Sequence, residues 1–352
     1  MKNLKVAPWI SVKDAMERLD STAEKVLLVV DEKERLLGSL TDGDIRRHIL
    51  KNKSITESIE DVFNTQPFFV YERDYNKAEL KQLFATYKLN LIPILDKESV
   101  VKNYVTWGEM FGNNIAKKRK CVDAPVVIMA GGKGTRLEPF TKVLPKPLIP
   151  VGDKTIVDHI IERFCEYGIN KFYFTINYMA KIIRAYFEEK VHDYSVGFAQ
   201  EEEFRGTAGS LKLLRDQLTT PFFVSNCDIL IEADYSDIYE FHLQNNYDIT
   251  LVAAAKQFHI PYGICELNGN GSLKKIKEKP QYNFLVNTGL YVLKPESLSL
   301  IPDQGIFHIT HLMEKIQSKG GHVGVYPVSD NSWIDVGQWT EYKKALKVIE
   351  HN

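Results

Sequence analysis

The sequence predicts a doubly wound α/β domain with a mixed, mostly parallel sheet, preceded by a smaller α+β module made of two similar halves. Two observations carry this prediction. From residue 124 onward, short apolar runs alternate with helical stretches, as in sheets whose parallel strands are joined by helices. Ahead of that point, the chain contains an internal repeat.

The repeat is defined by matched residue types at a constant spacing. Three pairs lie 65 residues apart: Asp31 and Asp96, Thr41 and Thr106, and Asp44 and Glu109. In each half an apolar run suits a buried strand, and the later Thr-x-x-(Asp/Glu) pattern is a capping box that opens a helix. We therefore expect residues 1–116 to form one module, residues 117–123 a polar linker, and residues 124–352 a second domain.

The first module resembles a pair of CBS domains, the Bateman module, over roughly residues 5–115. In that family a Gly-h-x-Thr-x-x-Asp segment holds the ribose and phosphates of an adenine nucleotide. The resemblance implies regulatory-nucleotide contacts from five residues: Gly38, Thr41, Asp44, Thr106 and Glu109. The second half departs from the pattern, because Asn103 stands where the first half has Gly38. The alternative is that Thr41 and Asp44 only cap a helix.

The second domain opens with an apolar run at 124–130 and a glycine-rich loop at 131–137. Glycines after a buried strand let backbone N–H groups approach phosphates, at the sheet edge where open α/β sheets bind ligands. The loop matches neither a Walker A motif nor a dinucleotide fingerprint. Arg136 follows the glycines, and Lys146 lies between two prolines. Two cations beside a triphosphate suit stabilisation of charge on an α-phosphate.

This domain resembles the sugar-phosphate nucleotidyltransferases over about residues 125–348. Further motifs follow in the family's order: Gly-Thr-Ala-Gly-Ser at 206–210 behind the acids 201–203, Asn-Cys-Asp at 226–228, Glu-Lys-Pro at 278–280, Asn-Thr-Gly at 287–289 and Trp-Ile-Asp-Val-Gly at 333–337. The resemblance implies nucleotide contacts from seven residues: Ala130, Gly131, Gly132, Gly134, Thr135, Gly206 and Thr207. It implies sugar-phosphate contacts from four: Glu278, Lys279, Asn287 and Gly289.

The implied reaction is attack of a sugar 1-phosphate on a nucleoside triphosphate, with release of pyrophosphate. The expected catalytic set is Arg136, Lys146, Asp228 and Lys279. Asp228 and Asp335 are the expected Mg²⁺ ligands, since Mg²⁺ prefers one or two carboxylates plus substrate oxygens and water. The alternative role of Asp335 is to cap the turn before Gly337. A phosphate monoester is a competent nucleophile, so positioning and electrostatics suffice without a covalent intermediate.

A CBS pair ahead of this transferase resembles the glucosamine-1-phosphate guanylyltransferases of bacterial legionaminic acid biosynthesis. That resemblance implies GTP and glucosamine 1-phosphate as substrates. Two alternatives stay open: uridylyl, cytidylyl or thymidylyl transfer to another sugar 1-phosphate, and a catalytically dead nucleotide-sensing or assembly protein.

The bulk composition excludes several other classes. A net charge of −1 creates no field that would draw the chain to nucleic acid or to an anionic membrane. The four cysteines are scattered, which argues against a disulfide framework and a thiolate metal site. No apolar run approaches the length of a membrane span. We expect a cytoplasmic protein, and the resemblance to CBS pairs implies a homo-oligomer.

Overall fold

The structure is a computed structural model that describes residues 4–22, 25–51, 54–73, 75–87, 89–106, 109–110 and 119–349. It divides into two compact units. The N-terminal unit comprises residues 1–118 together with 254–286 and 329–331. The catalytic-side unit comprises residues 119–253, 287–328 and 332–352. Residues 111–116, at the end of the expected first module, and 117–118, at the start of the expected linker, lie outside the described residues.

The N-terminal unit contains two three-stranded sheets of the same construction. Their strand orders are β1-β2-β3 and β4-β5-β6, each with one parallel and one antiparallel pairing. The strands are β1 Lys5–Val6, β2 Val26–Val30, β3 Leu36–Thr41, β4 Val70–Tyr71, β5 Leu91–Leu95 and β6 Val101–Thr106. The register shifts between Val29 and Val30 in one sheet and between Ile94 and Leu95 in the other. These positions are 65 residues apart, so the repeat extends to the same irregularity in the same strand.

Helices α1 (Val12–Thr22), α2 (Asp42–Leu50) and α3 (Lys77–Tyr87) accompany these two sheets. The predicted capping boxes are formed in both halves. The Asp44 carboxylate accepts a hydrogen bond from the Thr41 N–H at 2.9 Å, and the Thr41 hydroxyl accepts one from the Asp44 N–H at 3.4 Å. Glu109 and Thr106 exchange the equivalent bonds at 2.8 and 3.2 Å.

The catalytic-side unit is built on a seven-stranded sheet with the order β11-β10-β7-β12-β17-β14-β18. Strands β11, β10, β7 and β12 are parallel neighbours, and β17 runs antiparallel to β12. The strands are β7 Val126–Met129, β10 Lys171–Ile176, β11 Ser195–Gln200, β12 Phe222–Asn226, β14 Ile249–His259, β17 Gln281–Leu293 and β18 Val323–Ser329. The mixed, mostly parallel sheet confirms the predicted fold class.

Helices pack on both faces of this sheet, because its central strands are apolar on both sides. On one face, Phe164 of α5 (Ile156–Cys165) and Tyr235 of α8 (Tyr235–Gln244) pack against Phe223 at ring separations of 5.3 and 5.9 Å. On the other face, Leu312 and Ile316 of α9 (Ile309–Ser318) belong to a buried cluster with side chains of β12 and β17. Helices α6 (Ala180–Glu188), α7 (Gly206–Gly209) and α10 (Trp339–Ile349) also belong to this unit.

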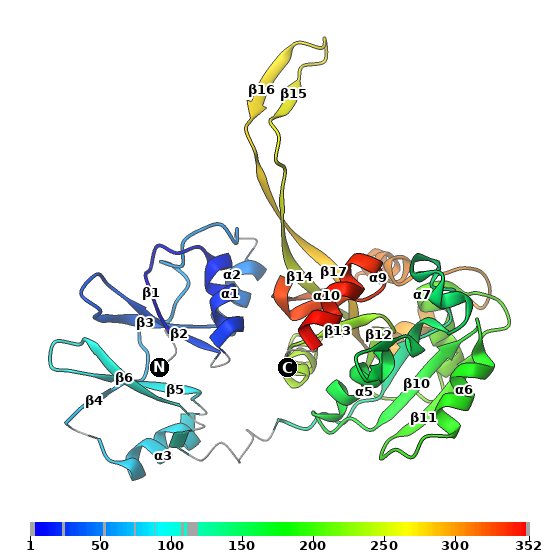
Figure 1. The fold of residues 1–352 in the computed structure, drawn as a ribbon, viewed down its shortest axis with the longest axis horizontal. Coiled ribbons are helices and arrows are strands. Elements are labelled where there is room, and N and C mark those ends of the chain that lie inside the picture. The colour runs from blue at the N-terminus through cyan, green and yellow to red at the C-terminus, as the bar shows by residue number, and fades with distance from the viewer. Residues whose placement is uncertain are drawn as a thin grey trace. The chain divides into compact units, whose positions relative to one another are not determined.

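Four short strands form two further pairs. Strand β13 (Ile229–Ile231) pairs antiparallel with β19 (Trp333–Asp335), outside the main sheet. The far halves of β14 and β17 continue into a two-stranded ribbon that carries the hairpin β15 (Ile264–Leu267) and β16 (Leu273–Lys277), drawn in yellow in Figure 1. Of the helices in the described part of the chain, none has both the length and the apolar character needed to cross a membrane.

Candidate functional site

The glycine-rich loop begins at the carboxyl end of β7, and its residue Gly134 packs against the Lys146 side chain. Gly134 adopts φ +67°, and a Cβ there would lie 2.9 Å from Thr141 Cγ2 and 3.1 Å from Lys146 Cβ. A side chain at Gly132 would instead meet no neighbouring atom within 4 Å. Ala130 follows the last residue of β7, and its N–H still donates to the Thr175 carbonyl of β10 at 2.9 Å. The open part of the loop therefore begins after Ala130.

The loop ends in a 3-10 turn, Thr135–Leu137, which carries Arg136 toward Asp228. A second 3-10 turn, Lys146–Leu148, carries the lysine. The Lys146 ammonium forms a close ion pair with the Asp228 carboxylate, and both side chains are about nine-tenths buried. Arg136 Nη2 lies 4.0 Å from Asp228 Oδ2, and its side chain is 59% exposed. Three of the four expected catalytic residues thus meet at one carboxylate.

Asp335 reaches the same place through the pairing of β13 with β19. Ile229 is the register partner of Asp335, and the Val336 N–H donates to the Asp228 carbonyl at 2.8 Å. The Asp335 carboxylate accepts a hydrogen bond from the Gly337 N–H at 2.8 Å, so the turn-capping role is present. A Cβ on Gly337 would overlap Asp228 Oδ2 and lie 2.8 Å from Asp335 Oδ1 and 3.0 Å from Lys146 Nζ. Both carboxylates therefore face one point in space.

This donor set fits the expected metal. The described residues hold no cluster of three or more histidine, cysteine, aspartate or glutamate side chains arranged for a metal ion. Two converging carboxylates are nevertheless what Mg²⁺ uses when substrate phosphates and water supply its other ligands. Lys146 and Arg136 at the same carboxylate make the site a meeting point of both charge signs.

A second group of residues lies at the carboxyl ends of β10 and β11. Glu201 directly follows β11 and is only 4% exposed. Its carboxylate oxygens would lie 3.3 and 3.4 Å from a Cβ on Gly131, and it accepts a hydrogen bond from the Arg205 N–H at 3.3 Å. Burial raises the pKa of Glu201. Sequence reasoning noted this acid only as one of three before Gly206, so its place beside the glycine loop is new.

The segment 206–210, which carries two of the expected nucleotide contacts, is held by the start of α9. Gly206 adopts φ +81°, and a Cβ there would lie 2.7 Å from the Phe307 carbonyl oxygen. The Thr207 hydroxyl accepts a hydrogen bond from the Ile309 N–H at 3.1 Å, and the Thr207 N–H donates to His308 Nδ1 at 3.4 Å. These contacts fix the backbone of the loop through residues more than 100 positions away.

The segment 287–289, which carries two of the expected sugar-phosphate contacts, packs against Asn226, two residues before Asp228. Gly289 adopts φ +89°, and a Cβ there would overlap the Asn226 amide. The Asn287 side chain accepts from the Gly289 N–H at 2.9 Å and donates to the Tyr291 hydroxyl at 2.8 Å. Between Asn226 and Asp228, Cys227 is buried, and burial raises the pKa of its thiol to about 12, which suits a packing role.

Two of the expected sugar-phosphate contacts lie in the other unit of the chain. Glu278 and Lys279 connect β16 to β17 within residues 254–286, which belong to the N-terminal unit. Lys279 adopts φ +41°, in the left-handed region. Their contacts with a sugar phosphate stay a prediction.

The N-terminal unit has a cavity of its own, with a volume of about 470 Å³. Side chains from both halves line it, including Ser39, Thr41, Asp44, Arg47, Phe63 and Asn90. Gly38 packs against this wall, because a Cβ there would overlap Phe63 and the Asn64 carbonyl. Asp44 forms a close ion pair with Arg47. Thr106 and Glu109 are not among the lining residues, and the Glu109 carboxylate accepts a hydrogen bond from the Thr106 N–H.

Comparison with known proteins matched two parts of the chain to two different families. A family model described as nucleotidyl transferase matches residues 125–352, and a CBS domain model matches residues 9–51. The mannose-1-phosphate guanyltransferase of Yarrowia lipolytica is 33% identical over 224 residues, which are 60% of this chain and 60% of that protein. The mannose-1-phosphate guanylyltransferase catalytic subunit beta of Dictyostelium discoideum is 31% identical over 229 residues, 62% of this chain and 63% of that protein. The chain thus spans less than two thirds of the length of these relatives.

Solved structures support the same fold. The crystal structure of HddC from Yersinia pseudotuberculosis is 25% identical with a TM-score of 0.51, covering 64% of this chain and 99% of that one. A crystal structure of HddC complexed with GMP-PN is 24% identical, also with a TM-score of 0.51, over the same shares of the two chains.

Proposed function

The chain belongs to the nucleotidyl transferase family, and we propose that it joins GTP to a hexose 1-phosphate, releasing pyrophosphate and a GDP-sugar. The observation that carries this proposal is the convergence of Lys146, Asp228 and Asp335 on one point, with Arg136 4.0 Å from Asp228. A site with two carboxylates and two cations beside a phosphate-binding loop suits transfer between anionic partners.

The chain's own residues would act by charge and position. The backbone N–H groups that follow Gly131 would hold triphosphate oxygens. Arg136 and Lys146 would balance the negative charge that develops on the α-phosphate and on the departing pyrophosphate. Asp228 and Asp335 would hold Mg²⁺, which when bound neutralises phosphate oxygens.

The burial of Glu201 supports the choice of guanine. Guanine presents two adjacent N–H donors, N1–H and the N2 amino group, and a carboxylate accepts such a pair in a bidentate way. Uracil and thymine present one N–H between two carbonyl oxygens, which a carboxylate would repel. A buried carboxylate whose pKa is raised by burial gains from a neighbouring pair of donors. Two relatives are also named as guanylyl- or guanyltransferases.

For the sugar, we propose glucosamine 1-phosphate, used for surface-glycan or nonulosonic acid biosynthesis in the cytoplasm. The combination of a CBS unit with the transferase unit supports this choice. Mannose 1-phosphate is the competing substrate, because the relatives carry that name. An activity matrix of four nucleoside triphosphates against several sugar 1-phosphates, read as pyrophosphate release with Mg²⁺, tests both choices. Turnover with UTP or CTP and none with GTP would exclude the guanylyl proposal.

We also propose that the cavity of the N-terminal unit binds a regulatory nucleotide. Its volume of about 470 Å³ lies within the usual range for small-ligand sites. Thr41 and Asp44 line it, and Arg47 adds a cation suited to a phosphate. Calorimetry of the full chain with AMP, ATP and GTP, compared with Arg47→Ala, tests this. A heat of binding that Arg47→Ala leaves unchanged would exclude the proposed phosphate contact, and no heat with any nucleotide would favour a role in homo-oligomer assembly.

A further inference from the structure

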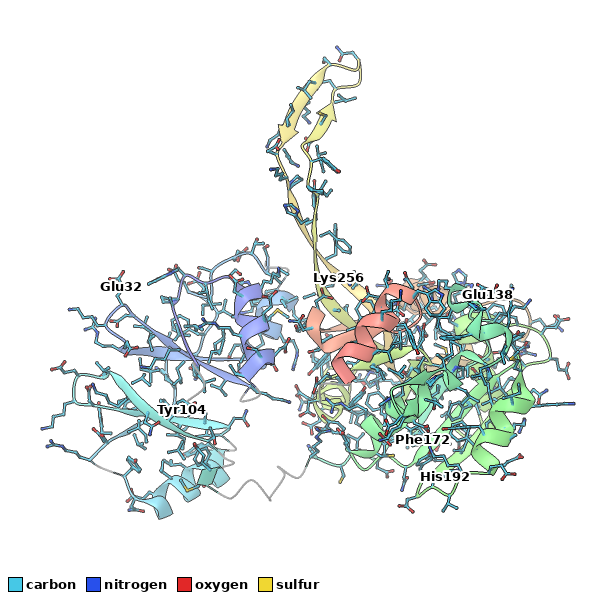
Figure 2. All side chains as sticks on the ribbon, in the orientation of Figure 1. Glu32, Tyr104, Glu138, Phe172, His192 and Lys256 are labelled. Atoms are coloured by element: carbon cyan, nitrogen blue, oxygen red, sulfur yellow. The ribbon has the colours of Figure 1, made fainter. Side chains whose placement is uncertain are left out.

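Helix α10 begins at Trp339, two residues after Gly337, and its first turn contacts the segment between Arg136 and Lys146. The Trp339 indole Nε1 donates to the Glu138 carbonyl at 3.1 Å, at the residue labelled in Figure 2. The Trp339 ring also lies 5.0 Å from the Phe140 ring. One turn later, the Tyr342 ring lies 6.2 Å from Phe140, and its hydroxyl donates to the Pro150 carbonyl at 2.8 Å.

The segment that this aromatic pair holds is otherwise open to solvent along much of its length. Phe140 is 40% exposed and Val143 is 73% exposed. On the inner side, the Thr141 carbonyl accepts from the Tyr178 hydroxyl at 3.3 Å, and the Thr141 hydroxyl donates to the Gly134 carbonyl at 3.0 Å. Contacts from α10 therefore cover the side of this segment that would otherwise face solvent.

Arg136 depends on this segment for its direction. Its side chain is mostly exposed, so packing around the guanidinium does not fix it. The 3-10 turn that carries Arg136 is capped by Glu138, whose N–H donates to the Thr135 carbonyl at 3.2 Å. The Trp339 hydrogen bond is made to the carbonyl of this same capping residue. A shift of Glu138 would therefore turn the backbone from which Arg136 reaches Asp228.

The same C-terminal stretch also carries the second carboxylate. Asp335 and Gly337 lie four and two residues before Trp339, and Gly337 faces Asp228 and Lys146. We propose that Trp339, supported by Tyr342, is a positioning residue that holds Arg136 in place beside Asp228 and Asp335. We call the contacts of Trp339 with Glu138 and Phe140 the brace. The inference rests on the proposed function, because it assigns the brace to the site of nucleotidyl transfer.

A double-mutant cycle with Arg136 tests the proposal. Trp339→Ala should lower kcat on the order of ten- to a hundredfold, the scale of a misplaced catalytic group, while KM for the sugar 1-phosphate changes less than about twofold. Trp339→Phe keeps a ring over Phe140 and loses only the N–H donor, so its loss should be smaller. In an Arg136→Ala background, Trp339→Ala should cost at most about a further twofold, because Arg136 is the group through which it acts. Losses that multiply independently would overturn the proposal.

Limited trypsin digestion tests the brace without relying on activity. Lys142 lies in the held segment and its side chain is 67% exposed. Trp339→Ala should speed cleavage after Lys142 severalfold, with the melting temperature of the catalytic-side unit nearly unchanged. Tyr239→Ala is the matched control, since Tyr239 is an aromatic side chain of α8 that also donates to a backbone carbonyl, that of Pro221 at 3.2 Å. Equal acceleration in Tyr239→Ala, or none in Trp339→Ala, would overturn the brace.

The outcomes separate this inference from the proposed function. If Arg136→Ala alone leaves turnover unchanged, the proposed catalytic role of Arg136 fails, whatever the digestion shows. If Arg136→Ala lowers turnover while Trp339→Ala does not, the catalytic role stands and the brace fails. Trp339→Phe keeps both arms measurable if Trp339→Ala does not fold.

Discussion

His242 of α8 makes the stability of the catalytic-side unit depend on pH in a window that can be calculated. The side chain is fully buried, and its Nδ1 bonds to the Thr250 hydroxyl of β14 at 2.9 Å. Its Nε2 has no hydrogen-bond partner within the described residues. Burial, with a smaller contribution from Lys294, lowers the pKa of His242 from 6.5 to about 4.

The direction follows from proton binding in the two states. The unfolded chain takes up a proton at this residue near pH 6.5, whereas the folded chain does so only near pH 4. The contribution of His242 to stability is therefore fully present above about pH 6.5, is lost as pH falls from 6.5 to 4, and then stays constant. At about 1.4 kcal/mol per pKa unit, the loss amounts to about 3 kcal/mol.

Urea unfolding followed by circular dichroism, at pH 7.5 and pH 4.5, measures this loss. His242→Gln removes the titrating ring, so the fall in unfolding free energy between the two pH values should be smaller by about 2.5 kcal/mol, because the loss is not yet complete at pH 4.5. Other acid-sensitive groups titrate equally in both proteins, and the comparison therefore isolates His242. The reasoning is refuted if the wild-type and variant proteins lose the same free energy over this range.

Three further changes test the site and its support. Asp228→Asn should lower kcat in steady-state assays on the order of a hundredfold or more. Gly337→Ala should lower kcat to the same extent, because its Cβ would overlap the Asp228 carboxylate, and its melting temperature should stay within a few degrees of the wild-type value. A fully active Gly337→Ala would contradict the convergence of Asp228 and Asp335 on one point. Glu201→Gln should lower kcat/KM for GTP on the order of tenfold and narrow its advantage over UTP, whereas an unchanged ratio would remove Glu201 from base recognition. Asp158→Asn should lower the unfolding free energy by about 2 kcal/mol. The buried Asp158 carboxylate accepts hydrogen bonds from the Lys190 ammonium at 2.7 Å and from the Thr155 hydroxyl at 2.9 Å. An unchanged melting temperature would show that these hydrogen bonds add no stability.

The local features of the chain were predictable from sequence because they depend on neighbouring residues. The 65-residue repeat predicted two equivalent halves, and both capping boxes formed where their Thr-x-x-acid patterns lie. The buried run before the glycines became the central strand β7, and Gly134 takes the positive φ that a tight phosphate-binding turn requires. Periodicity and turn chemistry act over a few residues, so they can be read without knowing the tertiary fold.

The geometry of the site was decided by contacts between distant parts of the chain. Asp228 meets Asp335 only because β13 pairs with β19, and Glu201 meets Gly131 only because β11 and β7 both flank β10. The brace of Trp339 on Glu138 joins residues about 200 positions apart. The sequence by itself determined which residue types carry the chemistry and in what order they occur. Only the tertiary structure decided which of them touch, because long-range pairing depends on packing across the whole sheet, and no local pattern records it.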